Sequence, residues 1–134
     1  MRDWVGLSQQ DVADELGVNL NTVKRWEKPG NDCLPPEDAW SLLEHGLSIQ
    51  RRQIDYAFEV ADDQIEQTGK LPEQVVLTYY RDQQMYDDHG RDFGRFGQAN
   101  ATARAVAFVL EDIGCNVVFA YPDEGAISAE GSRY

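Results

Sequence analysis

LSQQDVADELGVNLNTVKRWE, residues 7–27, is the stretch around which the rest of this chain is organised, because it holds two short helical patterns separated by a sharp turn. Ser8 is a good helix N-cap, and Asp11 sits at the third helical position, as in a capping box. Gly17 can take the left-handed conformation that ends a helix, and Asn19 can cap a second one. The stretch therefore predicts two helices joined by a bend at Gly17.

The apolar residues of this stretch lie where two crossed helices need them. Val12, Ala13 and Leu16 form a narrow apolar stripe on the first helix. Val23 and Trp26 lie three residues apart on the second helix. Two helices that cross at about 90–120° approach closely at one point, where only a small residue such as Ala13 fits. The pattern predicts a helix-turn-helix, although an αα-hairpin in a helical bundle would share parts of it.

The segment resembles the helix-turn-helix of the Cro/C1 repressor class, the xenobiotic-response-element type, in the SQ that opens its first helix and the WE that closes its second. The spacing also matches Arg2, four residues before Gly6, to the arginine that pairs in this class with the glutamate, here Glu27. The class normally has a full helix ahead of this arginine, whereas here only Met1 precedes it. We expect a truncated start, or a helix reduced to a turn, with a weakened N-terminal core.

The polar side of the second helix supplies the candidate DNA contacts. Asparagine can pair with adenine and arginine with guanine, each worth about 1–3 kcal/mol of discrimination, and leucine can touch a thymine methyl group. We expect base contacts from Asn19, Leu20, Asn21, Lys24 and Arg25. We expect backbone phosphate contacts from Ser8, Thr22 and Lys28. The resemblance adds Gln9, which matches a phosphate-gripping glutamine of the class. The alternative is a solvated helix face in a domain that kept the fold and lost the DNA.

The overall charge is unfavourable for a DNA-binding protein, since the 134 residues carry a net charge of −12. The acid is concentrated outside the helix-turn-helix: the net charge is −1 over residues 1–30, −6 over residues 31–70 and −5 over residues 71–134. Because affinity for DNA comes largely from phosphate neutralisation, we expect weak non-specific binding, confined to low salt. A dimer would double the few contacts that each copy makes.

Length and composition limit the number of domains and the classes of protein to which the chain can belong. The length fits one ordinary domain or two very small ones. No apolar run is long enough to span a membrane, and the polar N-terminus does not resemble a signal peptide. Cys33 and Cys115 lie far apart and lack a second pair, which predicts neither a disulfide framework nor a zinc site. Isolated cysteines, buried or half-buried, fit a reducing cytoplasm.

The middle of the chain predicts two helices in succession. Pro36 suits a first helical turn, and the helix that it opens either ends or kinks at Gly46. A longer helix is expected from about Leu47 to Gln67, stopped by Gly69, and connects to a second unit. The three tryptophans Trp4, Trp26 and Trp40 are expected to pack rather than to bind.

In the C-terminal part of the chain, the sequence pattern changes from that of a helix to that of a strand. We expect a strand at Gln74–Tyr80, a short helix at Arg81–Tyr86, a polar loop at Asp87–Gly97, a helix capped by Asn100 and closed by Gly114, and a strand at Cys115–Tyr121. Two strands and one helix are too few to be stable alone, so they need the long helix, a partner subunit, or both. We therefore expect a two-fold homodimer, joined through edge strands or the long helix.

The fold class predicted is α+β, mainly α. Residues 1–69 would form the DNA-binding domain with its long connecting helix, residues 70–122 a small strand–helix–strand dimerisation unit, and residues 123–134 a loose tail. The order of elements is similar to small repressors that include anti-CRISPR-associated autorepressors, in which a compact C-terminal unit makes the dimer. The similar pieces are RWE at 25–27, LPPEDAW at 34–40, QRRQIDYAF at 50–58, VVLTYY at 75–80 and ATARAVAFVLEDIG at 101–114.

The sequence gives little support for catalysis. Asp87, Asp88 and His89 could bind a metal, but no second set of ligands stands at a recognisable spacing. No phosphate-binding glycine loop, nucleophile elbow or H-E-x-x-H motif occurs. We expect no enzymatic activity, no catalytic residue, no metal and no cofactor.

The expected function is a homodimeric, sequence-specific repressor that binds double-stranded DNA at a pseudo-palindromic operator. Two alternatives stay open. In one, the chain is an antitoxin-like or adaptor module whose acidic C-terminal half binds a basic protein. In the other, it is a ligand-sensing regulator with a pocket within residues 71–122, lined by Tyr79, Tyr80, Arg81 and the loop at 87–97.

Overall fold

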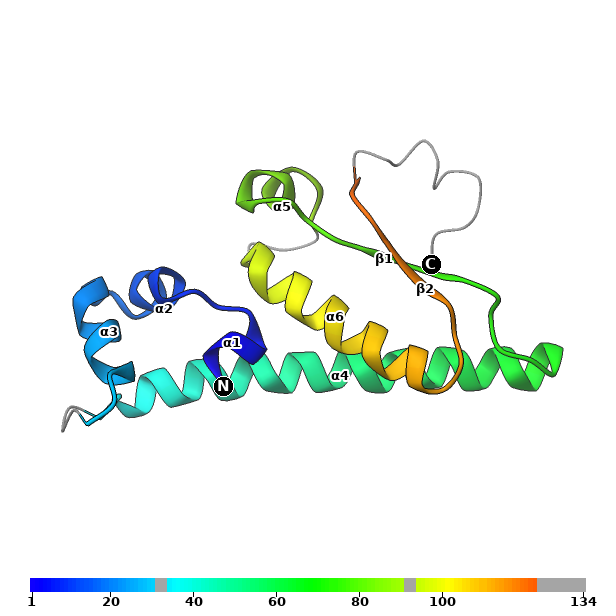
Figure 1. The fold of residues 1–134 in the computed structure, drawn as a ribbon, viewed down its shortest axis with the longest axis horizontal. Coiled ribbons are helices and arrows are strands. Elements are labelled where there is room, and N and C mark those ends of the chain that lie inside the picture. The colour runs from blue at the N-terminus through cyan, green and yellow to red at the C-terminus, as the bar shows by residue number, and fades with distance from the viewer. Residues whose placement is uncertain (31–33, 91–93, 123–134) are drawn as a thin grey trace.

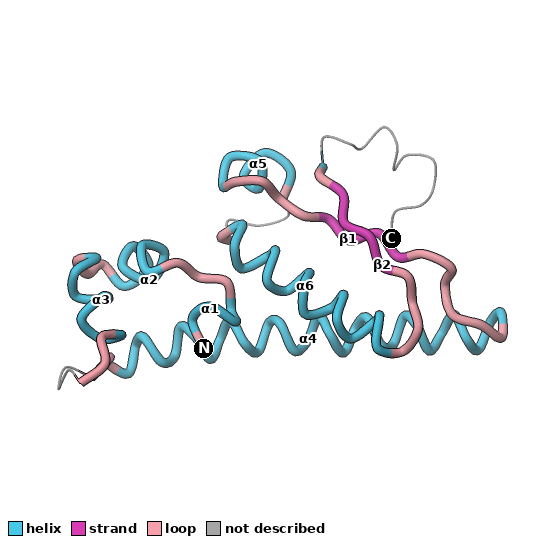
Figure 2. The backbone as a smooth tube through the Cα atoms, in the orientation of Figure 1, coloured by secondary structure: helices cyan, strands magenta, loops and turns pink. Residues whose placement is uncertain are grey.

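The computed structural model describes residues 1–30, 34–90 and 94–122, so the tail expected at 123–134 and Cys33 lie outside the described residues. The chain is mainly helical with one small parallel sheet, which confirms the predicted fold class (Figures 1 and 2). The elements in order are α1 (Arg2–Val5), α2 (Gln9–Leu16), α3 (Leu20–Glu27), α4 (Glu37–Thr68), β1 (Val75–Thr78), α5 (Gln83–His89), α6 (Phe96–Asp112) and β2 (Val117–Ala120).

Helix α4 is the longest element and carries all the others along one side (Figure 1). Its 32 residues extend about 48 Å at 1.5 Å per residue. The expected end or kink at Gly46 is wrong, because the helix continues through it. Gly46 is buried against α1 instead, where an added Cβ would lie 2.4 Å from Cγ1 of Val5. The predicted stop at Gly69 is confirmed by its left-handed conformation, with φ of 79°.

Helices α1, α4 and α6 meet at a junction without room for side chains. Gly6 ends α1 with φ of 88°, and a Cβ on Gly97 of α6 would lie only 2.4 Å from the Gly6 carbonyl oxygen. Gln50 of α4 is buried beside them and donates from Nε2 to the carbonyl oxygen of Trp4 at 3.0 Å. This backbone-to-backbone approach joins the N-terminal helices to the C-terminal part of the chain.

Helix α6 begins earlier than expected, at Phe96, so the predicted N-cap role of Asn100 is wrong. Asn100 is buried inside the helix, where its Nδ2 donates to the Tyr80 carbonyl oxygen at 2.7 Å and its Oδ1 accepts from the Tyr80 N–H at 2.9 Å. The side-chain amide thus satisfies both backbone groups of a residue just beyond β1. The loop expected at 87–97 is wrong at both ends, since α5 runs to His89 and α6 begins at Phe96.

The sheet contains two parallel strands, paired from Val75↔Val117 to Thr78↔Ala120, and both are shorter than predicted. Parallel neighbours need a long crossover connection, which α5 and α6 supply. Helix α6 lies between α4 and the sheet (Figure 1). The core between these layers is formed by Ala61, Leu77, Val106, Ala107, Leu110 and Cys115. Burial raises the pKa of the Cys115 thiol.

A second core lies under α1, α2 and α3. It is formed by Val5, Leu7, Val12, Ala13 and Val23. Leu42, Leu43 and Leu47 of α4 pack against it, so the small N-terminal core is completed by the long helix. Trp26 packs there as predicted, whereas Trp4 and Trp40 are 62% and 46% exposed, which makes their predicted packing role wrong. None of the described helices is both long and apolar enough to cross a membrane.

Candidate nucleic-acid interface

The ends of α2 and α3 are fixed by local hydrogen bonds, as the sequence predicted. Ser8 and Asp11 form a capping box, in which Oγ of Ser8 accepts from the Asp11 N–H at 2.9 Å and the Asp11 carboxylate accepts from the Ser8 N–H at 3.0 Å. Gly17 ends α2 with φ of 66°. Asn19 caps α3 through its Oδ1, which accepts from the Asn21 N–H at 2.8 Å. These bonds fix the three-residue turn between the helices.

Helix α3 has one packed face and one open face. Val23 is 1% exposed and Trp26 packs beside it on the N-terminal core. The opposite face carries exposed polar side chains at the i, i+3, i+4 and i+7 positions of a single helical face: Asn21, Lys24, Arg25 and Lys28. Within the described residues, no acid forms an ion pair with these three cations. Figure 1 shows α3 at one outer end of the molecule, and the side chains of this face are exposed there.

The other residues predicted to contact DNA differ in their exposure. Asn19 and Ser8 are exposed, although one oxygen of each is used in capping. Leu20 and Thr22 are half-buried at the margins of the open face. Gln9 is half-buried, and its Nε2 donates to Oε1 of Glu27 at 3.2 Å. The structure therefore groups four predicted residues on one face, whereas the other five are half-buried or take part in local hydrogen bonds.

An ion pair at the end of α3 joins the first three helices. Arg2 of α1 donates to the Glu27 carboxylate twice, from Nε to Oε2 at 2.6 Å and from Nη2 to Oε1 at 3.0 Å, which confirms the predicted pairing. Gln9 of α2 donates to the same carboxylate. The hydrogen bonds from Arg2 lower the pKa of the Glu27 carboxyl, and the same bonds raise the pKa of the guanidinium. The acid on α3 is thus neutralised within the site.

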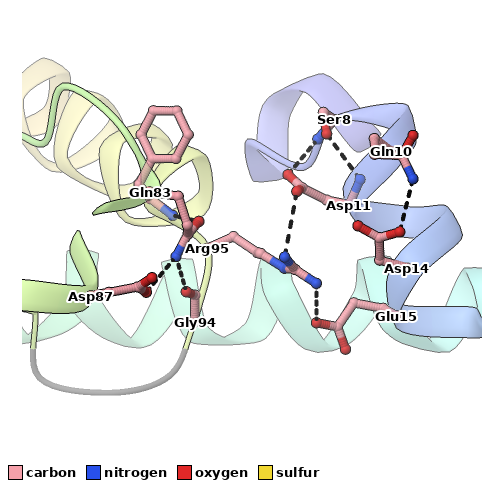
Figure 3. Close-up of polar contacts among 10 residues, drawn as sticks. Ser8, Gln10, Asp11, Asp14, Glu15, Gln83, Asp87, Gly94 and Arg95 are labelled. Atoms are coloured by element: carbon pink, nitrogen blue, oxygen red, sulfur yellow. Dashed lines mark hydrogen bonds and ion pairs between the residues drawn. The ribbon is translucent and has the colours of Figure 1, made fainter. Parts of the chain in front are cut away.

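Arg95 is a residue of this site that the sequence pattern did not predict. It precedes α6, yet its guanidinium reaches α2, with Nη2 3.1 Å from Oε1 of Glu15 and Nη1 3.9 Å from Oδ1 of Asp11 (Figure 3). Gln83 of α5 holds the backbone on both sides of it: Nε2 donates to the Gly94 carbonyl oxygen, and Oε1 accepts from the N–H of the residue after Arg95. No local pattern marks a contact between residues 80 positions apart.

The residues predicted to line a sensor pocket have different surroundings where the structure describes them, and residues 91–93 of the predicted loop lie outside the described residues. Tyr79 borders a hollow of about 170 Å³ together with Phe119 and Tyr121. Tyr80 packs edge-on against Tyr86 with ring centroids 4.7 Å apart, and the Arg81 guanidinium lies 4.3 Å above the ring of Tyr121. Among residues 1–30, 34–90 and 94–122, no group of three or more potential metal ligands comes together.

Comparison of this chain with known protein families, with curated proteins and with solved structures finds no match.

Proposed function

We propose that this chain is a sequence-specific DNA-binding transcriptional regulator that acts as a homodimeric repressor. Two copies of α3 would enter successive major grooves, about 34 Å apart on a pseudo-palindromic operator, and would block the promoter by occupying it. This mechanism needs no catalytic group or cofactor. Such a protein acts in the cytoplasm, and the buried thiol of Cys115 is compatible with a reducing compartment.

The observation that carries the proposal is the division of α3 into two faces. Val23 and Trp26 fix the helix on the core, so its position does not depend on the residues offered to DNA. The open face combines an amide with three cations at the outer end of the molecule. Asparagine and arginine can read base edges, whereas lysines near a helix end suit phosphates. We assign base contact to Asn21 and Arg25, and phosphate contact to Lys28.

The pairing of the acidic side chains of α2 and α3 supports the same proposal. Four carboxylates of α2 and α3 would repel a phosphate backbone, and each has a partner. Arg2 neutralises Glu27, and Arg95 faces Asp11 and Glu15. The fourth, Asp14, accepts a hydrogen bond from Gln10 at 2.8 Å. The cations of the open face are left available for DNA, although the whole chain is strongly acidic.

The test is to select bound duplexes from random DNA and to measure affinity for them across a range of salt concentrations. We expect Arg25→Ala to lose preference at one base-pair position, at a cost of about 1–3 kcal/mol. Lys28→Ala should weaken all duplexes alike and reduce the salt slope by about one contact. Lys70→Ala is the matched control, because Lys70 is an exposed cation beyond the far end of α4.

The proposal fails if no duplex is enriched over the starting pool. It also fails if Arg25→Ala and Lys28→Ala change affinity no more than the control does. Unfolding curves of the three variants should superimpose on that of the unmodified chain, since all three side chains are exposed.

A further inference from the structure

Exposed aromatic side chains gather on the surface between α1 and α6. Trp4 is 62% exposed and Phe108 is 74% exposed, although both are large apolar residues. They border a shallow groove of about 430 Å³, which is lined by Asp3, Trp4, Ala101, Arg104, Ala105 and Phe108. Single exposed apolar residues are ordinary, but a shared groove marks an interaction surface.

The same surface continues onto the sheet through Arg104. Its guanidinium bonds the Tyr79 hydroxyl and lies 5.9 Å from the centroid of that ring. Tyr79 in turn packs edge-on against Phe119 of β2, with centroids 5.3 Å apart. Phe119 is 44% exposed. We call this set the aromatic surface: Trp4, Tyr79, Arg104, Phe108 and Phe119.

We propose that the aromatic surface is the place where a second copy of this chain docks. The proposal rests on the proposed function for its premise that two α3 helices must act together. The aromatic surface takes nothing from α2 or α3. A contact made through it therefore uses no residue of the open face of α3 in either copy.

Charge favours a second copy as the occupant. Two chains of net charge −12 repel each other over most of their surface. The aromatic surface carries a cation, Arg104, with Asp3 at the rim of its groove, so it is close to neutral. A two-fold contact must be self-complementary. An arginine and an acid within one groove meet that requirement. Asp3 pairs with Arg2 of its own chain at 3.0 Å, but its side chain is 89% exposed and can still face Arg104 of the other copy.

The exposed area is also of the right size. If an aromatic residue has about 200 Å² to bury, the exposed fractions of Trp4, Phe108 and Phe119 amount to roughly 360 Å² per copy. A standard interface buries about 800 Å² per partner. The three rings would supply nearly half of that area, which is the share expected of an apolar centre within a polar rim.

The test is sedimentation equilibrium of the full chain without DNA. We expect a dimer, with Phe108→Ser and Trp4→Ser each raising the dimer dissociation constant at least ~10-fold, since each removes an exposed aromatic anchor. Tyr56→Ser is the matched control: Tyr56 is 63% exposed, but it lies on α4 outside the aromatic surface. Its dissociation constant should change less than ~2-fold. Melting curves recorded below the dimer dissociation constant of the unmodified chain should be alike for all three variants.

Two results would overturn the inference. One is a chain that stays monomeric up to ~100 µM, including the case in which its aromatic surface binds a different protein. The other is a dimer that Tyr56→Ser dissociates while Phe108→Ser does not, which would place the contact on α4.

A failure of DNA binding can be distinguished from a failure of dimer formation. If the dimer forms and dissociates as expected but no duplex is bound, the docking surface stands and the proposed function falls. If Phe108→Ser is monomeric and still binds a single half-site, both stand.

Discussion

Replacing Gly97 by alanine tests the junction of α1, α4 and α6 most directly. At an ordinary helical position this change stabilises a protein by up to about 1 kcal/mol, because alanine is the better helix former. Here the new Cβ would lie 2.4 Å from the carbonyl oxygen of Gly6. An ordinary contact is about 1 Å longer, and the atom in the way belongs to the backbone, so α1 and α6 must move apart.

The expected size follows from these opposing effects. Overpacking costs typically about 1–3 kcal/mol, and more where the backbone has to shift. After the gain in helix propensity, Gly97→Ala should lower the free energy of unfolding by about 2 kcal/mol. For a chain of this length, that is a fall in melting temperature of roughly 6–10 °C.

The assay is urea unfolding followed by far-UV circular dichroism, with a thermal melt beside it. Glu111→Ala is the control, because Glu111 is an exposed α6 residue that should tolerate alanine within about 0.5 kcal/mol. Gly6→Ala should be worse than Gly97→Ala, since Gly6 also has a positive φ of 88°. If Gly97→Ala is as stable as the unmodified chain or more stable, the close approach of α1 and α6 is refuted.

Three further predictions concern single polar groups. Asn100→Ala should destabilise the fold by about 2–4 kcal/mol in urea unfolding, because both backbone groups of Tyr80 lose their hydrogen bonds to the Asn100 amide. A change below about 0.5 kcal/mol, the level of an ordinary surface substitution, would contradict this role. Glu27→Gln should cost up to about 1 kcal/mol at neutral pH. Because the pKa of Glu27 is lower in the folded chain than its usual 4.5, this cost should be fully present above pH 4.5. It should be lost as the pH falls through the lowered pKa, where the unmodified carboxylate is protonated and no longer pairs with Arg2. Unfolding curves at neutral and acid pH check the sign. Arg95→Ala should weaken DNA binding about 2- to 5-fold on every duplex alike, because two carboxylates of α2 lose their cation, and high salt should abolish the difference.

The sequence by itself determined the features that depend on near neighbours. The capping residues Ser8 and Asn19 and the bend at Gly17 act within three or four positions, so their hydrogen bonds can be predicted from spacing alone. The 3.6-residue period of α3 likewise separates Val23 from the open face that carries Arg25. The pairing of Arg2 with Glu27 is not local, and only the resemblance to a helix-turn-helix class anticipated it.

The tertiary structure alone decided how the two parts of the chain meet. A glycine such as Gly46 often ends a helix. Here α4 continues through it, because Val5 fills the space where a side chain would be. Asparagine is a common N-cap residue. Asn100 nevertheless lies inside α6, because the chain just beyond β1 passes beside it. Arg95 joins the candidate site from 80 residues away. For Gly46 and Asn100 the local preference is worth about 1–2 kcal/mol at most, and contacts between distant segments outweigh it.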